Sequence, residues 1–198
     1  MIYDWFLELS EKIKVNIIAY DYEGYGKAIG TPNEQSCYEN IEAVYSYLTE
    51  THHISPDKII LYGRSLGSGP STYLANKLSQ QGVHLGGLIL QSPILSIYRV
   101  AFNFRFTLPG DFFPNIDRIS TVACPVYIIH GTRDEIVPFW NGEDLFLAAP
   151  VNWRAKPYWV EGAGHNNIET LLREEGLFFK RMKEFIEEWV IPPNYSTS

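Results

Sequence analysis

The sequence predicts an α/β domain with a mostly parallel sheet that is flanked by helices. Three observations support this fold class. The 198 residues contain five short apolar runs, most of these runs are separated by segments with helical periodicity, and each run is bounded by Gly, Pro or Asp. Strands that alternate with helices form right-handed βαβ units, in which the strands are buried on both faces and their sequences are continuously apolar.

The five apolar runs are the expected strands of this sheet. They are residues 15–21, 58–63, 85–91, 125–131 and 156–162. Ligands of such sheets bind outside the carboxyl ends of the strands. Residues that carry chemistry are therefore sought in the loops that follow these runs.

Two segments show the periodicity of amphipathic helices. Apolar side chains recur every three or four positions in residues 34–50 and in residues 167–190. A stripe of this kind packs on the core. Both stripes are interpreted as core faces rather than as cofactor-binding surfaces.

A single domain is expected over residues 1–191. The chain is long enough for one hydrophobic core, and it contains no repeat, low-complexity tract or linker. Residues 93–120 are aromatic and contain prolines, so they are expected to form a short irregular, lid-like segment over the strand ends. Residues 192–198 are expected to be a tail.

Charge and composition argue against several functional classes. The formal net charge is −7, so the chain has no basic excess to neutralise phosphates, and no nucleic-acid partner is expected. No run of 18 apolar residues and no basic leader is visible, which predicts an intracellular, cytoplasmic location. Cys37 and Cys124 are expected to be free thiols. Neither a metal nor an organic cofactor is expected, because no metal-ligand spacing occurs.

A Gly-x-Ser-x-Gly pattern lies between an apolar strand and a helical run. It runs from Gly63 to Gly67, in the strand-turn-helix context of a nucleophile elbow. The elbow holds its serine at a strained backbone angle, and both glycines are expected to be needed because side chains would collide across the turn. Ser65 is the predicted nucleophile, and the N–H of Leu66 is the predicted donor to an oxyanion.

A serine hydroxyl needs a histidine as base. His165 is predicted for this role, because it lies in the loop between the last expected strand and the last helix, at the carboxyl edge of the sheet. His130 lies within a strand and is interpreted as structural. The other histidines precede strands, at the opposite edge: His52, His53 and His84.

The histidine in turn needs an acid to orient it. Asp134 is predicted for this role, because it lies in the loop after the strand at 125–131 and therefore at the same edge. The neighbouring Glu135 is the main alternative.

Several stretches resemble the α/β-hydrolase superfamily and, more narrowly, its Bem-like group, which includes the α/β-hydrolase-domain depalmitoylases. The resemblance implies that Ser65 is the nucleophile, Asp134 the acid and His165 the base, in the chain order of that fold. It covers nearly the whole chain. The matching stretches are NIIAYDYEGYGKAIGTPNE, ISPDKIILYGRSLGSGP, LQSPILS, FPNIDRIS, CPVYIIHGTRDEIVPF and YWVEGAGHNNIE.

The resemblance also implies parts that this sequence does not contain. In the family, a strand and a His-Gly-Asn-type loop, which gives the second oxyanion N–H, precede the helix that residues 3–13 resemble. An N-terminally truncated α/β-hydrolase fold with about five strands is therefore expected, with a slot between residues 15–21 and 58–63. Unpaired buried backbone groups cost about 1–3 kcal/mol each. Upstream residues, direct pairing of the two strands or a strand from another chain would have to close the slot.

The resemblance implies a serine hydrolase that cleaves esters or thioesters, with palmitoylated proteins as the substrates of related animal enzymes. An acylated protein or a small ester or thioester is thus the expected partner. Two alternatives stay open: a carboxylesterase or peptidase-like hydrolase of small substrates, and a non-catalytic scaffold that lacks one oxyanion donor. Peripheral membrane association is expected only if a lipidated segment lies upstream. The sequence does not indicate an oligomeric state.

Aromatic and other apolar side chains are concentrated in the irregular segment at 93–120. They could line an acyl pocket beneath a lid, or they could simply pack against the core. The candidate residues are Phe102, Phe104, Phe106, Leu108, Phe112 and Phe113.

Overall fold

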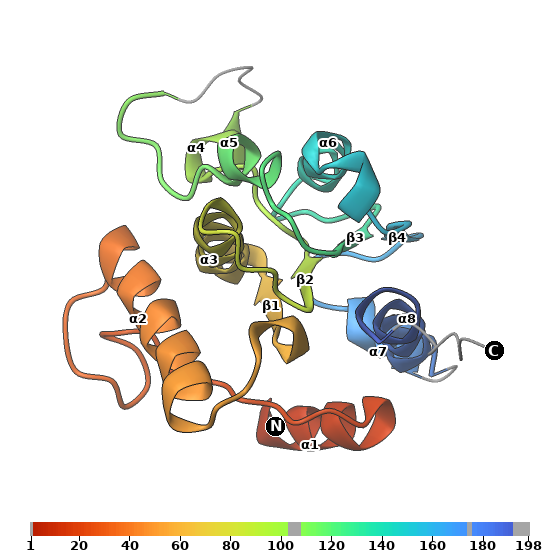
Figure 1. The fold of residues 1–198 in the computed structure, drawn as a ribbon. Helices are drawn as coiled ribbons and strands as arrows, with labels where there is room; N and C mark the ends of the chain where they lie inside the picture. Colours follow the sequence, from red (N-terminus) through yellow and green to blue (C-terminus); the bar gives the residue numbers. More distant parts are fainter. Residues whose placement is uncertain (1, 103–107, 174–175, 192–198) are drawn as a thin grey trace.

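The computed structural model describes residues 2–102, 108–173 and 176–191, and within them it has one parallel sheet (Figure 1). The four strands lie in the order β1-β2-β3-β4, all with parallel pairing. The strands are β1 Ile60–Arg64, β2 Gly87–Gln91, β3 Val126–Gly131 and β4 Tyr158–Val160. This is the α/β architecture that the alternating apolar runs predict.

Helices cover both faces of the sheet (Figure 1). On one side lie α2 Glu34–Ser46, α3 Ser68–Gln80, α5 Asn115–Ile119 and α6 Trp140–Ala148, and on the other lie α1 Ile2–Ile13, α7 Ile168–Arg173 and α8 Leu177–Phe185. A short α4, Ile97–Ala101, precedes α5. Single helical turns occur at Tyr47–Thr51, Pro56–Lys58, Ser65–Gly67, Val151–Trp153 and Ile186–Val190.

The sheet separates the two larger apolar clusters of the core, and a third, smaller cluster includes Tyr38 and Phe113. Successive side chains of a strand point to opposite faces, so Leu88 and Leu90 of β2 pack with Leu74 of α3, whereas Ile89 packs with Phe178 of α8. All five side chains are at most 2% exposed. Burial on both faces explains why the runs are continuously apolar.

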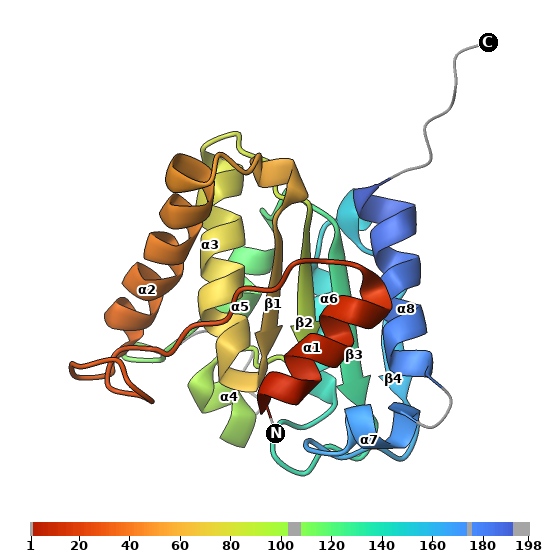
Figure 2. The ribbon, with the colours of Figure 1, turned by 90° about the horizontal axis from the view of Figure 1, so that it is seen from below.

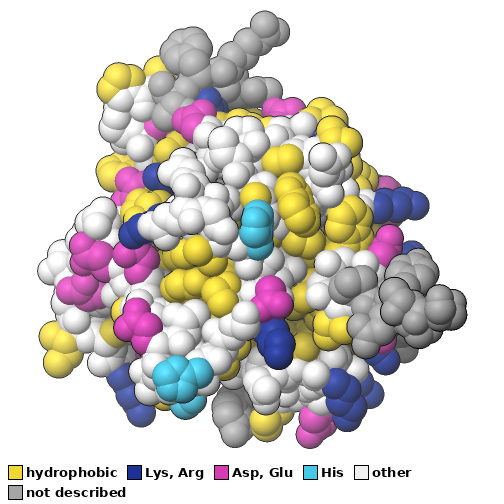
Figure 3. Space-filling model, viewed as in Figure 1, with side chains coloured by type: hydrophobic (Ala, Val, Ile, Leu, Met, Phe, Trp, Pro, Cys, Tyr) yellow, Lys and Arg dark blue, Asp and Glu magenta, His cyan; other side chains and the backbone are white. Residues whose placement is uncertain are grey.

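The face seen in Figure 1 is mixed in character. Figure 3 shows hydrophobic side chains over the middle of this face, with histidine, acidic and basic side chains among them and further charged side chains toward its edge. Among the helices of the described residues, none has the length and apolar character required to cross a membrane.

The expected strands are confirmed at 58–63, 85–91, 125–131 and 156–162, with ends shifted by a few residues. The prediction of a strand at 15–21 is wrong, and the sheet has four strands rather than about five. The apolar side chains of this segment do pack on the core, as the contacts of Val15, Ile17 and Tyr20 show. Within the described residues, however, no strand pairs with the segment, and a strand is defined by its ladder of hydrogen bonds to a neighbouring strand rather than by its side chains.

A cavity of about 1230 Å³ separates this segment from β1. Its walls include Ile17 and Ala19 on one side and Ile60 and Tyr62 on the other. Figure 2 shows the trace of residues 14–22 passing across β1. Within the described residues β1 pairs only with β2, so the slot that the resemblance implies is present and is not closed by direct pairing of the two segments.

Candidate active site

The turn after β1 places Ser65 in a strained conformation. Its φ angle is +51°, in the left-handed region where a residue with a Cβ atom costs roughly 1–3 kcal/mol. The next residues form one helical turn and then α3. Strain of this kind persists only where the surroundings enforce it. The half-buried Ser65 therefore sits where a nucleophile elbow would hold it, at the carboxyl edge of the sheet.

The elbow is enforced by close packing at Gly63 and by a buried serine. A Cβ atom on Gly63 would lie 2.6 Å from the carbonyl oxygen of Gly67 and 2.8 Å from Cα of Ser68. The fully buried Ser68 donates its hydroxyl to the carbonyl oxygen of Ser65 at 2.6 Å. The Nδ2 of Asn115 donates in turn to that hydroxyl at 3.1 Å.

The second glycine of the pattern is not sterically required, contrary to the sequence prediction. Gly67 has a φ of −61°, which any residue adopts. A Cβ atom there would meet only Oη of Tyr22, at 3.8 Å, which is ordinary contact. The close approach occurs on one side of the turn only, because the chain has already entered the helical path at Gly67.

We therefore expect opposite results from alanine at the two glycines. Gly63→Ala should lower the unfolding temperature by several degrees, because backbone atoms cannot move away cheaply from the new methyl group; overpacking of this kind costs about 1–3 kcal/mol. Gly67→Ala should leave that temperature unchanged within a degree or two. Thermal unfolding followed by circular dichroism measures both. Equal destabilisation by the two variants would contradict this account of the elbow.

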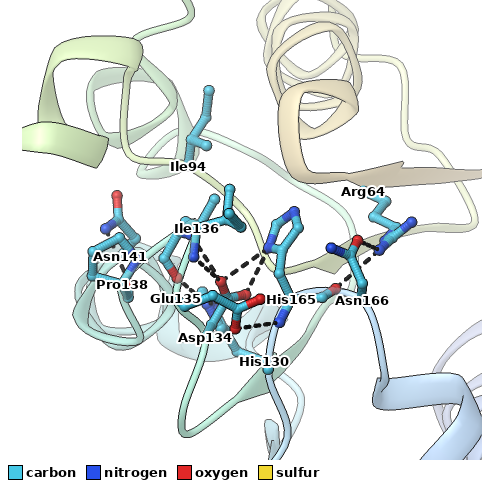
Figure 4. Close-up of polar contacts among 12 residues, drawn as sticks. Arg64, Ile94, His130, Asp134, Glu135, Ile136, Pro138, Asn141, His165 and Asn166 are labelled. Carbon is cyan, nitrogen blue, oxygen red and sulfur yellow. Dashed lines mark hydrogen bonds and ion pairs between the residues drawn. The ribbon is translucent and has the colours of Figure 1, made fainter.

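The loops after β3 and β4 bring Asp134 and His165 together (Figure 4). Nδ1 of His165 lies 2.8 Å from Oδ2 and 3.0 Å from Oδ1 of Asp134. Asp134 is only 8% and His165 only 6% exposed. A carboxylate can only accept, so Nδ1 carries the proton and Nε2 is left free to take one from another group.

The surroundings of Asp134 keep its carboxyl group ionised. Burial acts to raise its pKa, but the hydrogen bonds from His130, from His165 and from the backbone N–H groups of Val137 and Ile136 outweigh burial and hold the pKa well below its usual range. The N–H groups of Ile136 and Val137 donate to Oδ1 at 3.0 and 2.8 Å. A permanent negative charge thus faces Nδ1 of His165.

His130 and Glu135 contact this pair without replacing either member. Nε2 of the fully buried His130 lies 2.9 Å from the carbonyl oxygen of Val137 and 3.4 Å from Oδ2 of Asp134. Bonded to a carbonyl, this nitrogen must carry its proton. Glu135 accepts the backbone N–H of His165 at 3.2 Å, whereas Nδ1 of the ring makes both of its hydrogen bonds with Asp134. The geometry favours Asp134 over Glu135 as the group that orients the imidazole.

Ser65 lies at the same edge of the sheet, but no hydrogen bond joins its hydroxyl to His165 among the described residues. Catalytic hydrogen bonds are often long before substrate binds. The backbone N–H of Leu66 belongs to the first turn of a helical segment, where such groups have no intrahelical acceptor. No group of three or more potential metal ligands occurs in the described part of the chain.

The aromatic residues of the irregular segment do not form the expected pocket where they are described. Phe102 and Phe112 are 62% and 46% exposed, and neither lines the large cavity, which lies beside β1. Phe113 is buried against Tyr38, at 5.6 Å between ring centroids. Of the candidate aromatic residues that the structure describes, Phe113 is therefore buried in the core, whereas Phe102 and Phe112 are partly exposed. Phe104 and Phe106 lie outside the described residues.

One residue of this edge has no signal in the sequence. Arg64, the last residue of β1, donates through Nη2 to the carbonyl oxygen of His165 and to Oδ1 of Asn166, both at 2.9 Å (Figure 4). The first contact joins residues that are 101 positions apart. The Gly-x-Ser-x-Gly pattern leaves this position unspecified, so spacing alone could not identify it.

Comparison with known proteins gives a consistent picture. No family model matches the chain. It is 40% identical over 190 residues to human alpha/beta hydrolase domain-containing protein 17B; the match covers 94% of this chain and 62% of the human protein. It is 42% identical over 184 residues to mouse alpha/beta hydrolase domain-containing protein 17C; the match covers 92% of this chain and 54% of the mouse protein. The chain therefore spans a little over half the length of these relatives.

Solved structures share the fold at low sequence identity. A monoacylglycerol lipase from Paleococcus ferrophilus matches 93% of this chain and 88% of its own, with a TM-score of 0.68 and 18% identity. The Pyrococcus furiosus esterase Pf2001 matches 93% of this chain and 75% of its own, with a TM-score of 0.72 and 16% identity.

Proposed function

The chain has the α/β-hydrolase fold and resembles alpha/beta hydrolase domain-containing proteins 17B and 17C over more than nine-tenths of its length, and from this premise we propose that it is a serine hydrolase. It cleaves esters or thioesters through an acyl-enzyme. The observation that carries the proposal is the buried Asp134–His165 pair, hydrogen-bonded at 2.8 Å, at the edge where Ser65 is held at a φ of +51°. An ionised acid, a base with one free nitrogen and a strained serine are the parts that acyl transfer needs.

The reaction proceeds in two halves. In the first, Oγ of Ser65 attacks the carbonyl carbon of the substrate while Nε2 of His165 takes the hydroxyl proton. His165 then gives this proton to the departing alcohol or thiol. In the second, water gives a proton to His165 and attacks the acyl-enzyme; the acid departs and Ser65 recovers its proton. Asp134 stays ionised throughout and stabilises the imidazolium that forms in each half.

Charge on the substrate oxygen is stabilised by the N–H of Leu66 and by the amino end of the helical segment that follows it. The His-Gly-Asn-type loop that provides a second donor in the family does not occur in this sequence. One oxyanion donor contributes about 10²- to 10³-fold to turnover in serine hydrolases.

Palmitoyl thioesters of proteins are the proposed substrate class, on the strength of the resemblance. The fold hosts many chemistries, so the acyl group has to be identified by experiment. Hydrolysis should be measured for oxygen esters and thioesters with acyl groups from acetyl to palmitoyl. A rate that rises with chain length supports a depalmitoylase. A flat or falling series contradicts that part of the proposal and favours a small-substrate esterase.

The competing class is a non-catalytic scaffold with the same fold, which the lack of a hydrogen bond between Ser65 and His165 in the described residues favours. A boronic acid that mimics the tetrahedral intermediate separates the two classes, since it binds only where a serine can add to boron and the resulting anion is stabilised. Saturable binding by the folded chain, lost in Ser65→Ala, supports the hydrolase. Absence of binding to a folded chain contradicts it.

A further inference from the structure

We propose that Arg64 is a positioning residue, which holds the loop of the base at the correct distance from the nucleophile; this inference rests on the proposed function. Nη2 of Arg64 donates to the carbonyl oxygen of His165 and to Oδ1 of Asn166, both at 2.9 Å. Arg64 itself immediately precedes Ser65. A contact from Arg64 to His165 therefore links the backbone of the nucleophile directly to the backbone of the base (Figure 4).

The base loop is already tied to the sheet on its other side. The N–H of Arg133 donates to the carbonyl oxygen of Ala163 at 2.9 Å, and the N–H of His165 donates to Oε2 of Glu135 at 3.2 Å. These contacts fix the loop relative to the turn after β3, which contains the acid. Among the hydrogen bonds of the described residues, only those from Arg64 join the base loop to the end of β1, which directly precedes the serine.

A second contact from the neighbouring strand supports the same segment. Gln91, the last residue of β2, is the register partner of Arg64, so the two side chains project from the same face of the sheet. Nε2 of the fully buried Gln91 donates to Oε1 of Glu169 at 2.8 Å, and Gln91 accepts a hydrogen bond from Tyr62. Adjacent strand ends thus hold the chain just before and just inside α7.

The chemistry of Arg64 suits this role. Its guanidinium is always charged, and a charged donor makes a stronger hydrogen bond to a carbonyl than a neutral donor does. One nitrogen serves two acceptors on adjacent residues, which fixes the direction of the loop as well as its distance. Lysine keeps the charge but not the planar geometry, so it should restore only part of the function.

The test compares Arg64→Met and Arg64→Lys with a matched control, Arg154→Met. Nη1 of Arg154 also donates to two adjacent carbonyl oxygens, those of Phe146 and Leu147 at 3.0 Å each, but at the end of α6. Two readouts are used: kcat and KM for a p-nitrophenyl ester, and hydrogen exchange of the amides of residues 164–168 without substrate. The second readout does not depend on activity.

Arg64→Met is expected to lower kcat by roughly 10- to 100-fold, because small misplacements of catalytic groups have effects of this size, while KM changes little. The amides of residues 164–168 should exchange faster. Arg64→Lys should lie between Arg64→Met and the original protein, and Arg154→Met should change neither readout.

Three outcomes would overturn the inference: an unchanged kcat in Arg64→Met, unchanged exchange of the loop amides, or a rise in KM alone, which would make Arg64 a substrate contact. If the original protein does not hydrolyse any ester, the proposed function fails. The positioning of the loop by Arg64 is then decided by hydrogen exchange alone, so the two failures are distinguishable.

Discussion

Ser65→Ala is expected to lower kcat by about 10⁶-fold. Without the hydroxyl no acyl-enzyme forms, and His165 and Asp134 have no nucleophile to activate. The variant should also lose all labelling by a fluorophosphonate probe, which reacts with activated serines. Hydrolysis of a p-nitrophenyl ester and gel detection of the probe measure the two effects.

The fold of this variant can be checked independently. Alanine at position 65 keeps the Cβ atom and removes only a half-buried hydroxyl to which no hydrogen bond is assigned in the structure. Its unfolding temperature should therefore stay close to that of the original protein. Equal probe labelling of the two proteins, with both folded, would show that another residue is the nucleophile.

Asp134→Asn is expected to lower kcat by about 10⁴-fold. An amide offers no negative charge to Nδ1 of His165. The NH₂ group of the asparagine would donate to Nδ1 and so favour the tautomer with the proton on Nε2. A protonated Nε2 cannot accept the hydroxyl proton of Ser65. The effect should appear in kcat far more than in KM, since the acid contacts the base and not the substrate. Steady-state kinetics on the same ester measures both constants.

Glu135→Gln is the matched control, because Glu135 is the adjacent carboxylate and also contacts His165. Its Oε2 accepts the backbone N–H of His165 at 3.2 Å, and a glutamine oxygen can accept the same bond. We expect less than a tenfold change in kcat. If Glu135→Gln were the more damaging substitution, Glu135 and not Asp134 would be the acid.

The prediction of strands from apolar runs succeeded where the run also has a hydrogen-bonded neighbouring strand. Residues 58–63, 85–91 and 125–131 are apolar runs that a parallel sheet buries on both faces, and each has a hydrogen-bonded neighbour in the structure. Residues 15–21 have the same pattern but no such neighbour, and a cavity separates them from β1. An apolar run shows only that a segment is buried, whereas a strand also requires a second backbone.

In the turn at Ser65, too, the sequence pattern predicted one feature correctly and missed another that depends on atomic contacts. The pattern Gly-x-Ser-x-Gly correctly located a strained serine between a strand and a helix. It did not distinguish its two glycines, although a Cβ atom would come within 2.6 Å of the backbone at Gly63 and only within 3.8 Å of any atom at Gly67. The difference depends on the path of the chain after the turn.

The sequence by itself determined the α/β class, the strained Ser65 and the edge at which the predicted base and acid lie, because these follow from local patterns and from the direction of parallel strands. Only the tertiary structure placed the carboxylate of Asp134, rather than that of its neighbour Glu135, within hydrogen-bond distance of the imidazole of His165, and only it brought Arg64 to His165. These contacts depend on side-chain directions across 31 and 101 residues of chain. No local pattern encodes such directions; packing of the whole sheet and its helices does.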